Sequence, residues 1–352
     1  MGEPPVNAAR VVRAKKGVTW ASGAPALKHL LGYLLAAACL VWVFHDTHPE
    51  RLAKDLASIN WWWILPAILC HVVSYVCQGI RWRVLLAPTG ELSVRRATQA
   101  IFIGLFTNEV MPMRLGELVR AYLASRWISR PFADVVPSML LERLIDGIWL
   151  ALSAAVAALL VPLPARVVKT GEIFGLVVLV LTAAFVALIL RRPPVSARPV
   201  PRSGAGSRIG ALITGLAAGL HQIGNARTIW RAGLVSAGII VFQAAAFWLV
   251  MRGYRLDLPV SAGIIVFLIV HLGTAVPNAP GNVGSFQFFT VFGLSLFGVD
   301  KTHAAGFSIV VFLILTAPLW ALGSVALSRT GMSLADIRAA ARPGAAATSR
   351  LP

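Results

Sequence analysis

Residues 271–287, HLGTAVPNAPGNVGSFQ, lie between two apolar runs and yet hold two prolines, three glycines, two asparagines and a histidine. A continuous helix cannot pass through them, because Pro277 and Pro280 each remove a backbone donor and clash with the preceding turn. Irregular backbone at membrane depth is tolerated only where protein buries it or a watery cavity solvates it. The segment therefore predicts a broken helix at the functional centre of a membrane protein.

A second segment, residues 104–120 (GLFTNEVMPMRLGELVR), also interrupts an apolar run with a proline and a glycine. Pro112 and Gly116 have the same spacing as Pro280 and Gly284, which follow 168 residues later. Paired interrupted segments in corresponding halves of a chain point to the binding site of a transporter. The match is short, so an internal two-half repeat and a chance similarity both remain as interpretations.

The composition excludes a soluble domain. The chain has 352 residues, of which 57% are hydrophobic and 13% charged, with a mean hydropathy of +0.76. These values are typical of a polytopic membrane protein. The formal charge of +18 is explained by basic loops between apolar runs, and no nucleic-acid module accompanies it. The three cysteines show no metal-binding spacing, so we expect no metal, no cofactor and no nucleic-acid partner.

The apolar runs predict an all-α, polytopic transmembrane helix bundle with about eight membrane segments, two of them broken or re-entrant. We expect a basic tail over 1–26, a membrane domain over 27–328 and a second basic tail over 329–352. The membrane domain divides into halves of about 27–190 and 209–328, joined by the basic loop 191–208. Basic residues in both tails predict cytoplasmic termini for a multi-pass protein of the cell (inner) membrane.

Charged residues are expected at membrane depth in the run 135–161. Glu142 and Asp146 share one helix face, with Arg143 beside them. The apolar stretch that follows Asp146 is about 15 residues long, or roughly 22 Å, and is shorter than the ~30 Å hydrocarbon core. Part of this cluster should therefore lie inside the membrane boundary, where charges usually face a bundle interior or a cavity.

Arginines beside the free N–H groups of a broken helix suit an anionic headgroup or a phosphate, and nearby carboxylates can pair with them or bind a cationic group. Two of the candidate binding residues also have a simpler interpretation. Arg120 could anchor the protein to anionic lipid surfaces, and His271 could be a hydrogen-bonded helix residue. The predicted substrate-binding set is Asn108, Glu109, Pro112, Arg114, Gly116, Glu117, Arg120, Glu142, Arg143, Asp146, His271, Asn278, Pro280, Gly281, Asn282, Gly284 and Gln287.

Three ordered motifs carry a family resemblance: NEVMPMRLGELVRAYL, then MLLERLIDG, then VPNAPGNVGSFQ. Together they resemble the lysylphosphatidylglycerol synthase transmembrane-region family. Its P-x-R-x-G-E-x-x-R pattern falls on residues 112–120 and its E-R-x-x-D pattern on residues 142–146. Its late P-G-G-x-G-x-x-E pattern falls on Pro280, Gly281, Gly284 and Gln287, with Asn282 in place of the second glycine and Gln287 in place of the glutamate.

The resemblance implies a flippase-like integral membrane protein that translocates a lipid or lipid-linked headgroup in envelope biogenesis. The chain ends soon after its last span, so we expect no aminoacyl-transferase domain and no synthase activity. No catalytic signature is present either. The alternatives are a membrane scaffold or accessory subunit for an envelope synthase or glycosyltransferase partner and, less favoured, a membrane transferase with Glu142 or Asp146 as general base.

Overall fold

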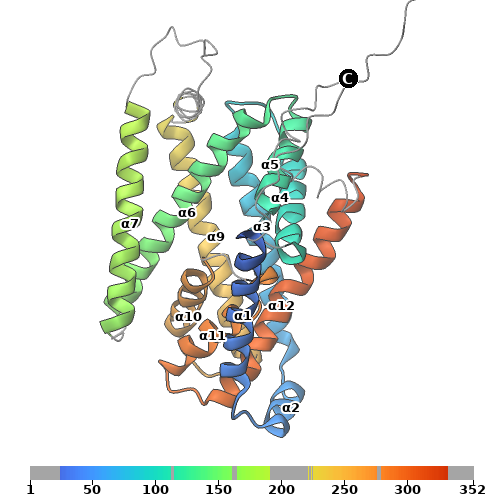
Figure 1. Cartoon of the computed structure of the whole chain (residues 1–352), viewed down its shortest axis with the longest axis vertical. Helices are drawn as coiled ribbons and strands as arrows, with labels where there is room; N and C mark the ends of the chain where they lie inside the picture. The colour runs from blue at the N-terminus through green and yellow to red at the C-terminus, as the bar shows by residue number, and fades with distance from the viewer. Residues whose placement is uncertain are drawn as a thin grey trace, which may run out of the picture.

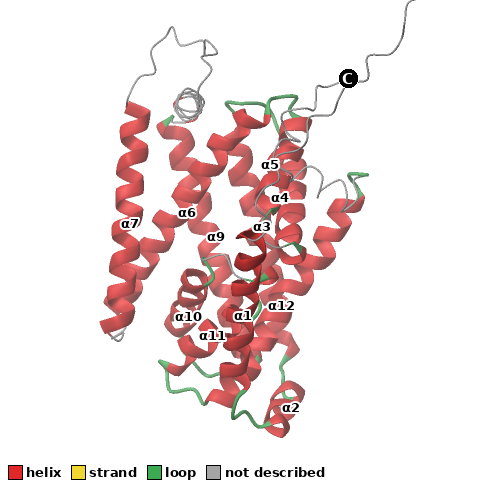
Figure 2. Ribbon diagram, viewed as in Figure 1, coloured by secondary structure: helices red, strands yellow, loops and turns green. Residues whose placement is uncertain are grey.

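The computed structural model describes residues 24–111, 115–160, 165–190, 221, 223, 225–275 and 279–331, and over these residues the protein contains helices and no β-strand (Figures 1 and 2). Pro112, Arg114 and Asn278 of the predicted site, the loop 191–208 and most of both tails lie outside the described residues. The all-α prediction is therefore confirmed for the part of the chain that is described.

The central element is an antiparallel pair of long helices, α3 (Trp61–Leu86) and α9 (Ala226–Gly253). At one end the Asn60 amide donates to the Gly253 carbonyl over 2.8 Å, and near the other end Arg81 contacts Ser236. Both helices begin at an asparagine whose side chain accepts a hydrogen bond from the first turn. Both are long and apolar enough to cross a membrane.

The first interrupted segment folds back on itself. Helices α4 (Val94–Val110) and α5 (Gly116–Trp127) form an antiparallel pair, which we call the upper hairpin because its helices lie in the upper half of Figure 1. A β-carbon on Gly116 would lie only 1.8 Å from the Gly104 carbonyl oxygen, so the two backbones touch near the turn. At the open end the Arg96 guanidinium lies over the Trp127 ring at 5.9 Å.

The second interrupted segment also folds back on itself, and it does so in the opposite half of the bundle. Helices α10 (Val260–Gly273) and α11 (Ser285–Ser295) form the lower hairpin, with the short 3₁₀-helix η2 (Pro280–Asn282) in its turn (Figure 1). Gly273 packs against Phe289, and Gly293 packs against Val266. These two contacts fix the antiparallel register of the hairpin.

The turns of the two hairpins meet. Helix η2 contacts α4, and a β-carbon on Gly281 would lie 2.7 Å from Oε2 of Glu109. Gly281 has a φ of +65°, a left-handed conformation that costs a glycine little, and it has room for no side chain. The two interrupted segments, far apart in sequence, therefore form one junction.

The remaining helices enclose the hairpins. Helix α12 (Lys301–Ser328) packs along α4, where the Gln99 side chain donates to the Ala326 carbonyl over 2.9 Å. Helix α1 (Ala24–Phe44) covers α11, and α2 (Pro49–Ala57) packs on the start of α12. Helix α6 (Phe132–Leu160) lies between the upper hairpin and α7 (Ala165–Leu190), which stands at the edge of the bundle (Figure 1).

Within the described ranges, length and composition identify four helices that could cross a membrane: α3, α9, α12 and residues Val168–Ala187 of α7. A fifth candidate is α1 taken together with α2, which are bent by 86° relative to each other. The expected total of about eight membrane segments stays a prediction. The short helices α4 and α11 are each one arm of a hairpin.

Candidate functional site

A cavity of about 540 Å³ lies where the two hairpin turns meet. Its wall is contributed by α3, α4, α5, α6, α9, α10, η2, α11 and α12, so it is enclosed by nearly the whole bundle. Most of the predicted site residues that are described line it, namely Asn108, Glu109, Gly116, Glu117, Arg120, Arg143, Asp146, His271, Pro280, Gly281 and Asn282. The structure therefore brings these predicted residues together around one cavity.

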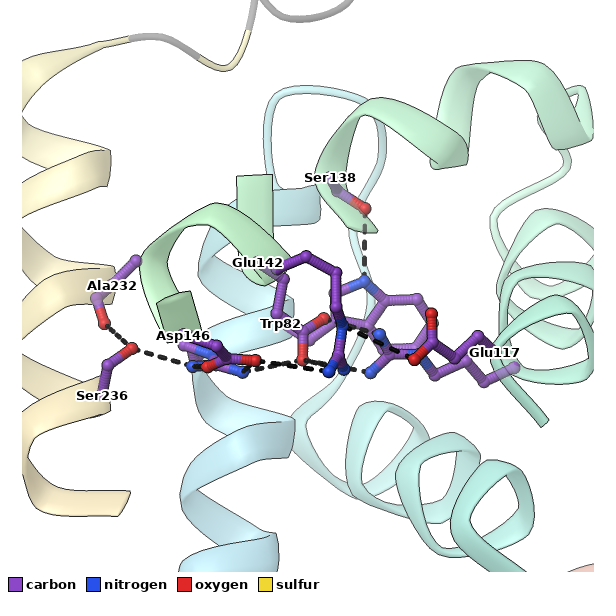
Figure 3. A network of polar contacts seen from close by, with 10 residues as sticks. Trp82, Glu117, Ser138, Glu142, Asp146, Ala232 and Ser236 are labelled. Atoms are coloured by element: carbon purple, nitrogen blue, oxygen red, sulfur yellow. Dashed lines mark hydrogen bonds and ion pairs between the residues drawn. The ribbon is translucent and has the colours of Figure 1, made fainter. Parts of the chain in front are cut away.

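The back of the cavity is a network of ion pairs (Figure 3). Arg81 of α3 donates to Glu142 over 2.8 Å, and it also bonds Asp146 and, over 2.9 Å, the Ser236 hydroxyl. Arg120 of α5 donates to both oxygens of Glu142, over 3.2 and 2.8 Å. Two helices, α3 and α5, are thus tied to one carboxylate of α6, and α9 is joined to α3 through Ser236.

The core of this network is shielded from solvent. Side chains of Arg81, Glu142 and Arg120 are 2%, 0% and 5% exposed. Removing ions from water is costly, and the cost is recovered only when the pairing geometry is good and further hydrogen bonds are made. Glu142 meets that condition because two guanidinium groups satisfy both of its oxygens. These residues form a fixed floor of the cavity.

Trp82 holds Arg120 from the other side. The guanidinium carbon of Arg120 lies 4.9 Å from the Trp82 ring centroid, and the Trp82 indole donates to the Ser138 hydroxyl over 3.2 Å (Figure 3). Trp82 is completely buried. Arginine is favoured in such places because its planar group stacks on an aromatic ring while its edge binds a carboxylate. The structure thus gives Arg120 a place inside the bundle, where the surface-anchor interpretation does not hold.

The front of the network is more open. Arg143 is 51% exposed, while Glu117 and Asp146 are 32% and 35% exposed. Each distance from Arg143 to an acidic neighbour is long. Its Nε lies 3.5 Å from Glu117, its Nη1 lies 3.6 Å from Asp146 and its Nη2 lies 3.9 Å from Glu142. These distances exceed those of strong charge-assisted hydrogen bonds. Since all three exposed residues line the cavity, Arg143 is the guanidinium that a ligand entering it would meet.

The turn of the upper hairpin is held by its own side chains. The Gly116 amide donates to the Asn108 side-chain oxygen over 2.8 Å, which satisfies a free N–H at the start of α5. Asn108 therefore stabilises the hairpin as well as lining the cavity. In the lower hairpin the Gln287 side chain accepts from the Gly284 amide over 2.7 Å and caps the start of α11 in the same way.

Three predicted residues do not line the cavity. Gln287 is 5% exposed and serves the Gly284 backbone, and Gly284, with a φ of +86°, packs against the backbone of Ala36 on α1. Both positions shape the lower hairpin and lie outside the cavity lining, so their assignment as substrate contacts stays a prediction. Glu142 lies behind the cavity wall, where it holds two arginines.

Arg81 is absent from the predicted site, because arginines at the end of an apolar run usually mark the cytoplasmic end of a membrane helix. The helix continues to Leu86, and Arg81 is 1% exposed. The sequence does contain a sign that the helix is longer, because apolar residues follow the arginines. If the helix ended at residue 80, these apolar residues would lie beyond it and would have no reason to be buried. Other cavity residues absent from the predicted site are His71, Tyr75, Gln78, Ser236 and Gln243.

Among the described residues no group of His, Cys, Asp and Glu side chains has the arrangement of a metal site. The three cysteines are free and partly exposed. Every carboxylate of the network instead faces a guanidinium. The arrangement suits the recognition of a charged headgroup.

The chain is similar to known membrane proteins over most of its length. The model of the lysylphosphatidylglycerol synthase TM region family matches residues 29–323. A UPF0104 membrane protein of Methanothermobacter thermautotrophicus is 24% identical over 314 residues, covering 84% of this chain and 90% of the relative. The glycosyltransferase AglD of Haloferax volcanii is 29% identical over 311 residues, which cover 78% of this chain and half of that protein.

Proposed function

The chain belongs to the lysylphosphatidylglycerol synthase TM region family, and from the geometry of its site we propose that it binds a phosphate-bearing lipid headgroup in the central cavity and moves it across the membrane. The observation that carries this proposal is the meeting of two opposed hairpin turns at a cavity with an ion-paired floor. Interrupted helices that meet near the midplane are the usual setting of a transporter's substrate site.

Arg143 is the residue we assign to the anionic part of the headgroup. Its contacts to Glu117, Glu142 and Asp146 are long, so a phosphate can replace them without breaking a short hydrogen bond. Glu117 is released by the same exchange and can receive hydroxyl or amino groups of the headgroup, while Asp146 stays bonded to Arg81. Arg81 and Arg120 stay bound to Glu142 and keep the floor in place.

The charge distribution supports a cytoplasmic position for the end of the bundle that is uppermost in Figure 1. That end carries the last turn of α3, the first turns of α4 and α9, and the ends of α5 and α12. Their basic residues are Arg83, Arg95, Arg96, Arg126, Arg227, Arg231 and Arg329. The opposite end has a similar number of basic residues, but there they alternate with acidic ones such as Asp46, Glu50, Asp55 and Asp300. From this excess of positive charge at the upper end we propose that the upper hairpin enters from the cytoplasm and the lower hairpin from the outside.

Liposomes can test the proposal directly. The purified protein would be reconstituted with a phosphatidylglycerol that carries a fluorophore on an acyl chain, and an impermeant quencher would report how fast the probe changes leaflet. We expect the wild type to accelerate this movement over protein-free liposomes. Arg143→Ala should lose most of the acceleration, because the exposed guanidinium is gone.

The matched control is Arg252→Ala. Arg252 also pairs with a carboxylate, Asp257, over 2.7 Å, but it lies at the far end of α9 and outside the cavity. It should move the probe at the wild-type rate. Equal rates for wild type, Arg143→Ala and protein-free liposomes would contradict the proposal.

The similarity to a protein named a glycosyltransferase favours one second candidate, an accessory role beside an envelope glycosyltransferase or other envelope synthase. The chain matches half of that relative, so a partner could supply what the other half contains. In that case a partner enzyme should copurify with the chain, and its activity should survive Arg143→Ala. Product formation by the purified chain alone would support an enzymatic role instead.

A further inference from the structure

One carboxylate in the cavity stands apart from the arginine network. Glu109 ends the upper hairpin's first helix, and its Oε2 is buried without a hydrogen-bond partner among the described residues. This oxygen lies against Gly281 in the turn of the lower hairpin. Trp320 of α12 provides a hydrogen bond to the same carboxylate. Glu109 therefore occupies the contact between the two turns.

Its titratable neighbours come from the helices packed around it. Helix α3 contributes His71 and Tyr75, whose ring nitrogen Nε2 and hydroxyl are 2.8 Å apart, and the other nitrogen of His71, Nδ1, is buried without a described partner. Helix α10 contributes His271, which interacts electrostatically with His71 and whose ring centroid lies 4.2 Å from that of Phe267. Helix η2 and the described part of α12 that faces the junction contribute no charged group.

The charged residues of α5 in this cavity are already paired. Arg120 binds Glu142, and Glu117 faces Arg143 at 3.5 Å. A carboxylate held by a guanidinium stays ionised, because the neighbouring positive charge favours the charged form. Arg114 lies outside the described residues. Among the described carboxylates of the cavity, Glu109 alone has no guanidinium within ion-pair distance.

We propose that Glu109, with His71, Tyr75 and His271, is a proton-binding site that couples the movement of the lipid headgroup to a proton gradient. The proposal rests on the transport function proposed above and adds an energy source to it. One proton binds the Glu109 carboxylate on one side of the membrane and leaves it on the other. No other bond forms or breaks.

The site suits a proton better than a metal cation. Sodium, magnesium and calcium ions are bound mainly by oxygen ligands. Glu109 interacts with the Trp320 indole and with Tyr75, whose hydroxyl in turn bonds the His71 imidazole. Among the described residues, no group of three or more His, Cys, Asp and Glu side chains is arranged to hold a metal ion.

The position of Glu109 gives protonation a mechanical consequence. An ionised carboxylate at the contact needs water or a cation, so it favours separated turns that admit solvent. The neutral acid can remain against Gly281, so it favours joined turns. The proton would thus bias the contact between the hairpins, while the arginine floor holds the headgroup.

The experiment uses the full-length protein in liposomes that contain fluorescent phosphatidylglycerol, with and without a pH difference across the membrane. The readout is the steady-state distribution of the probe between the leaflets. A coupled proton can shift that distribution by up to about tenfold for each pH unit. We expect the shift with the wild type and its loss when a protonophore is added.

Glu109→Gln should leave the two leaflets equally filled at every pH difference. The matched variant Glu117→Gln removes a carboxylate from the same cavity and should keep the dependence on the gradient, whatever its rate. Difference infrared spectra provide a second readout, the protonation of the carboxyl group itself, which does not depend on lipid movement. The wild type should show a carboxylic-acid band that titrates with pH, and Glu109→Gln should lack it.

The outcomes separate the two proposals. Probe that moves but always distributes equally would overturn proton coupling and leave the transport function standing. A shift driven by a sodium gradient, or a gradient response that survives in Glu109→Gln, would also overturn it. Absence of any protein-dependent movement would remove the transport function, and the coupling with it.

Discussion

Oε2 of Glu109 in the upper hairpin lies against the α-carbon of Gly281 in the lower hairpin, although 172 residues separate them in the chain. Any larger residue at 281 would have to displace this carboxylate, since its β-carbon would lie 2.7 Å away. The contact joins the two interrupted segments, in each of which a proline precedes a glycine by four residues. A single added methyl group at this contact would therefore disturb the junction of the hairpins.

Gly281→Ala should therefore lower both stability and lipid movement. The left-handed conformation alone costs a residue with a β-carbon about 1–2 kcal/mol, and the clash with Glu109 adds to it. Gly298 is the matched control, because it has a φ of +73° and nothing within 4 Å of its would-be β-carbon. Thermal unfolding in detergent and the liposome assay should show Gly298→Ala less stable but active, and Gly281→Ala impaired in both. Full activity of Gly281→Ala would contradict a tight junction.

The upper hairpin depends on a second close approach. Gly116→Ala would place a methyl group 1.8 Å from the Gly104 carbonyl oxygen, so α4 and α5 would have to separate. We expect a large loss of stability and of monodisperse protein in size-exclusion chromatography. Gly175→Ala on α7 is the control, since its β-carbon would meet open space and alanine favours a helix. A Gly116→Ala protein as stable as Gly175→Ala would mean that the hairpin does not pack as described.

Glu142 should be the most costly carboxylate to remove. Glu142→Ala leaves two buried guanidinium groups without their shared partner, and breaking such a pair costs about 3–5 kcal/mol. The free energy of unfolding can be followed through tryptophan fluorescence in denaturant. Asp257→Ala provides the comparison, because Asp257 is 85% exposed and its pair with Arg252 is screened by water. A similar loss in both variants would show that Glu142 is not buried.

Arg81→Lys should also fail as a conservative replacement. The Arg81 guanidinium contacts Glu142, Asp146 and Ser236 from two nitrogens, whereas an ammonium presents one compact charge. We expect Arg81→Lys to unfold at a lower temperature than the wild type, and Arg252→Lys at the surface to match the wild type. Equal melting temperatures for all three proteins would contradict the shared role of Arg81.

The helical class and the meeting of the two interrupted segments were predictable, because proline and glycine in an apolar run act locally on the backbone. The fold-back of each segment was left open, since it depends on close contacts such as Gly116 with Gly104 that no single stretch reveals. Arg81 was missed for a related reason. Its burial depends on Glu142, which lies 61 residues away, and composition near a helix end favours a surface position.

The contrast between Gln287 and Glu109 shows what side-chain type alone leaves undecided. Both are polar residues beside a break, and both were predicted to contact substrate. Gln287 turns to its own backbone at Gly284, while Glu109 faces the opposite hairpin. The difference arises from which backbone donors remain free after the chain folds, and a sequence does not display that directly.

The central claim is that a lipid headgroup enters the cavity between the hairpins, and photo-crosslinking tests it most directly. A phosphatidylglycerol with a photoreactive group on its headgroup would be irradiated in liposomes with the protein, and the labelled residues would be located by mass spectrometry. We predict labels on cavity residues such as Arg143, Glu117 and Asn282, and fewer labels in Arg143→Ala. Labels confined to the exposed apolar face of α7, around Leu176 and Leu179, would show that the headgroup stays outside and would contradict the account.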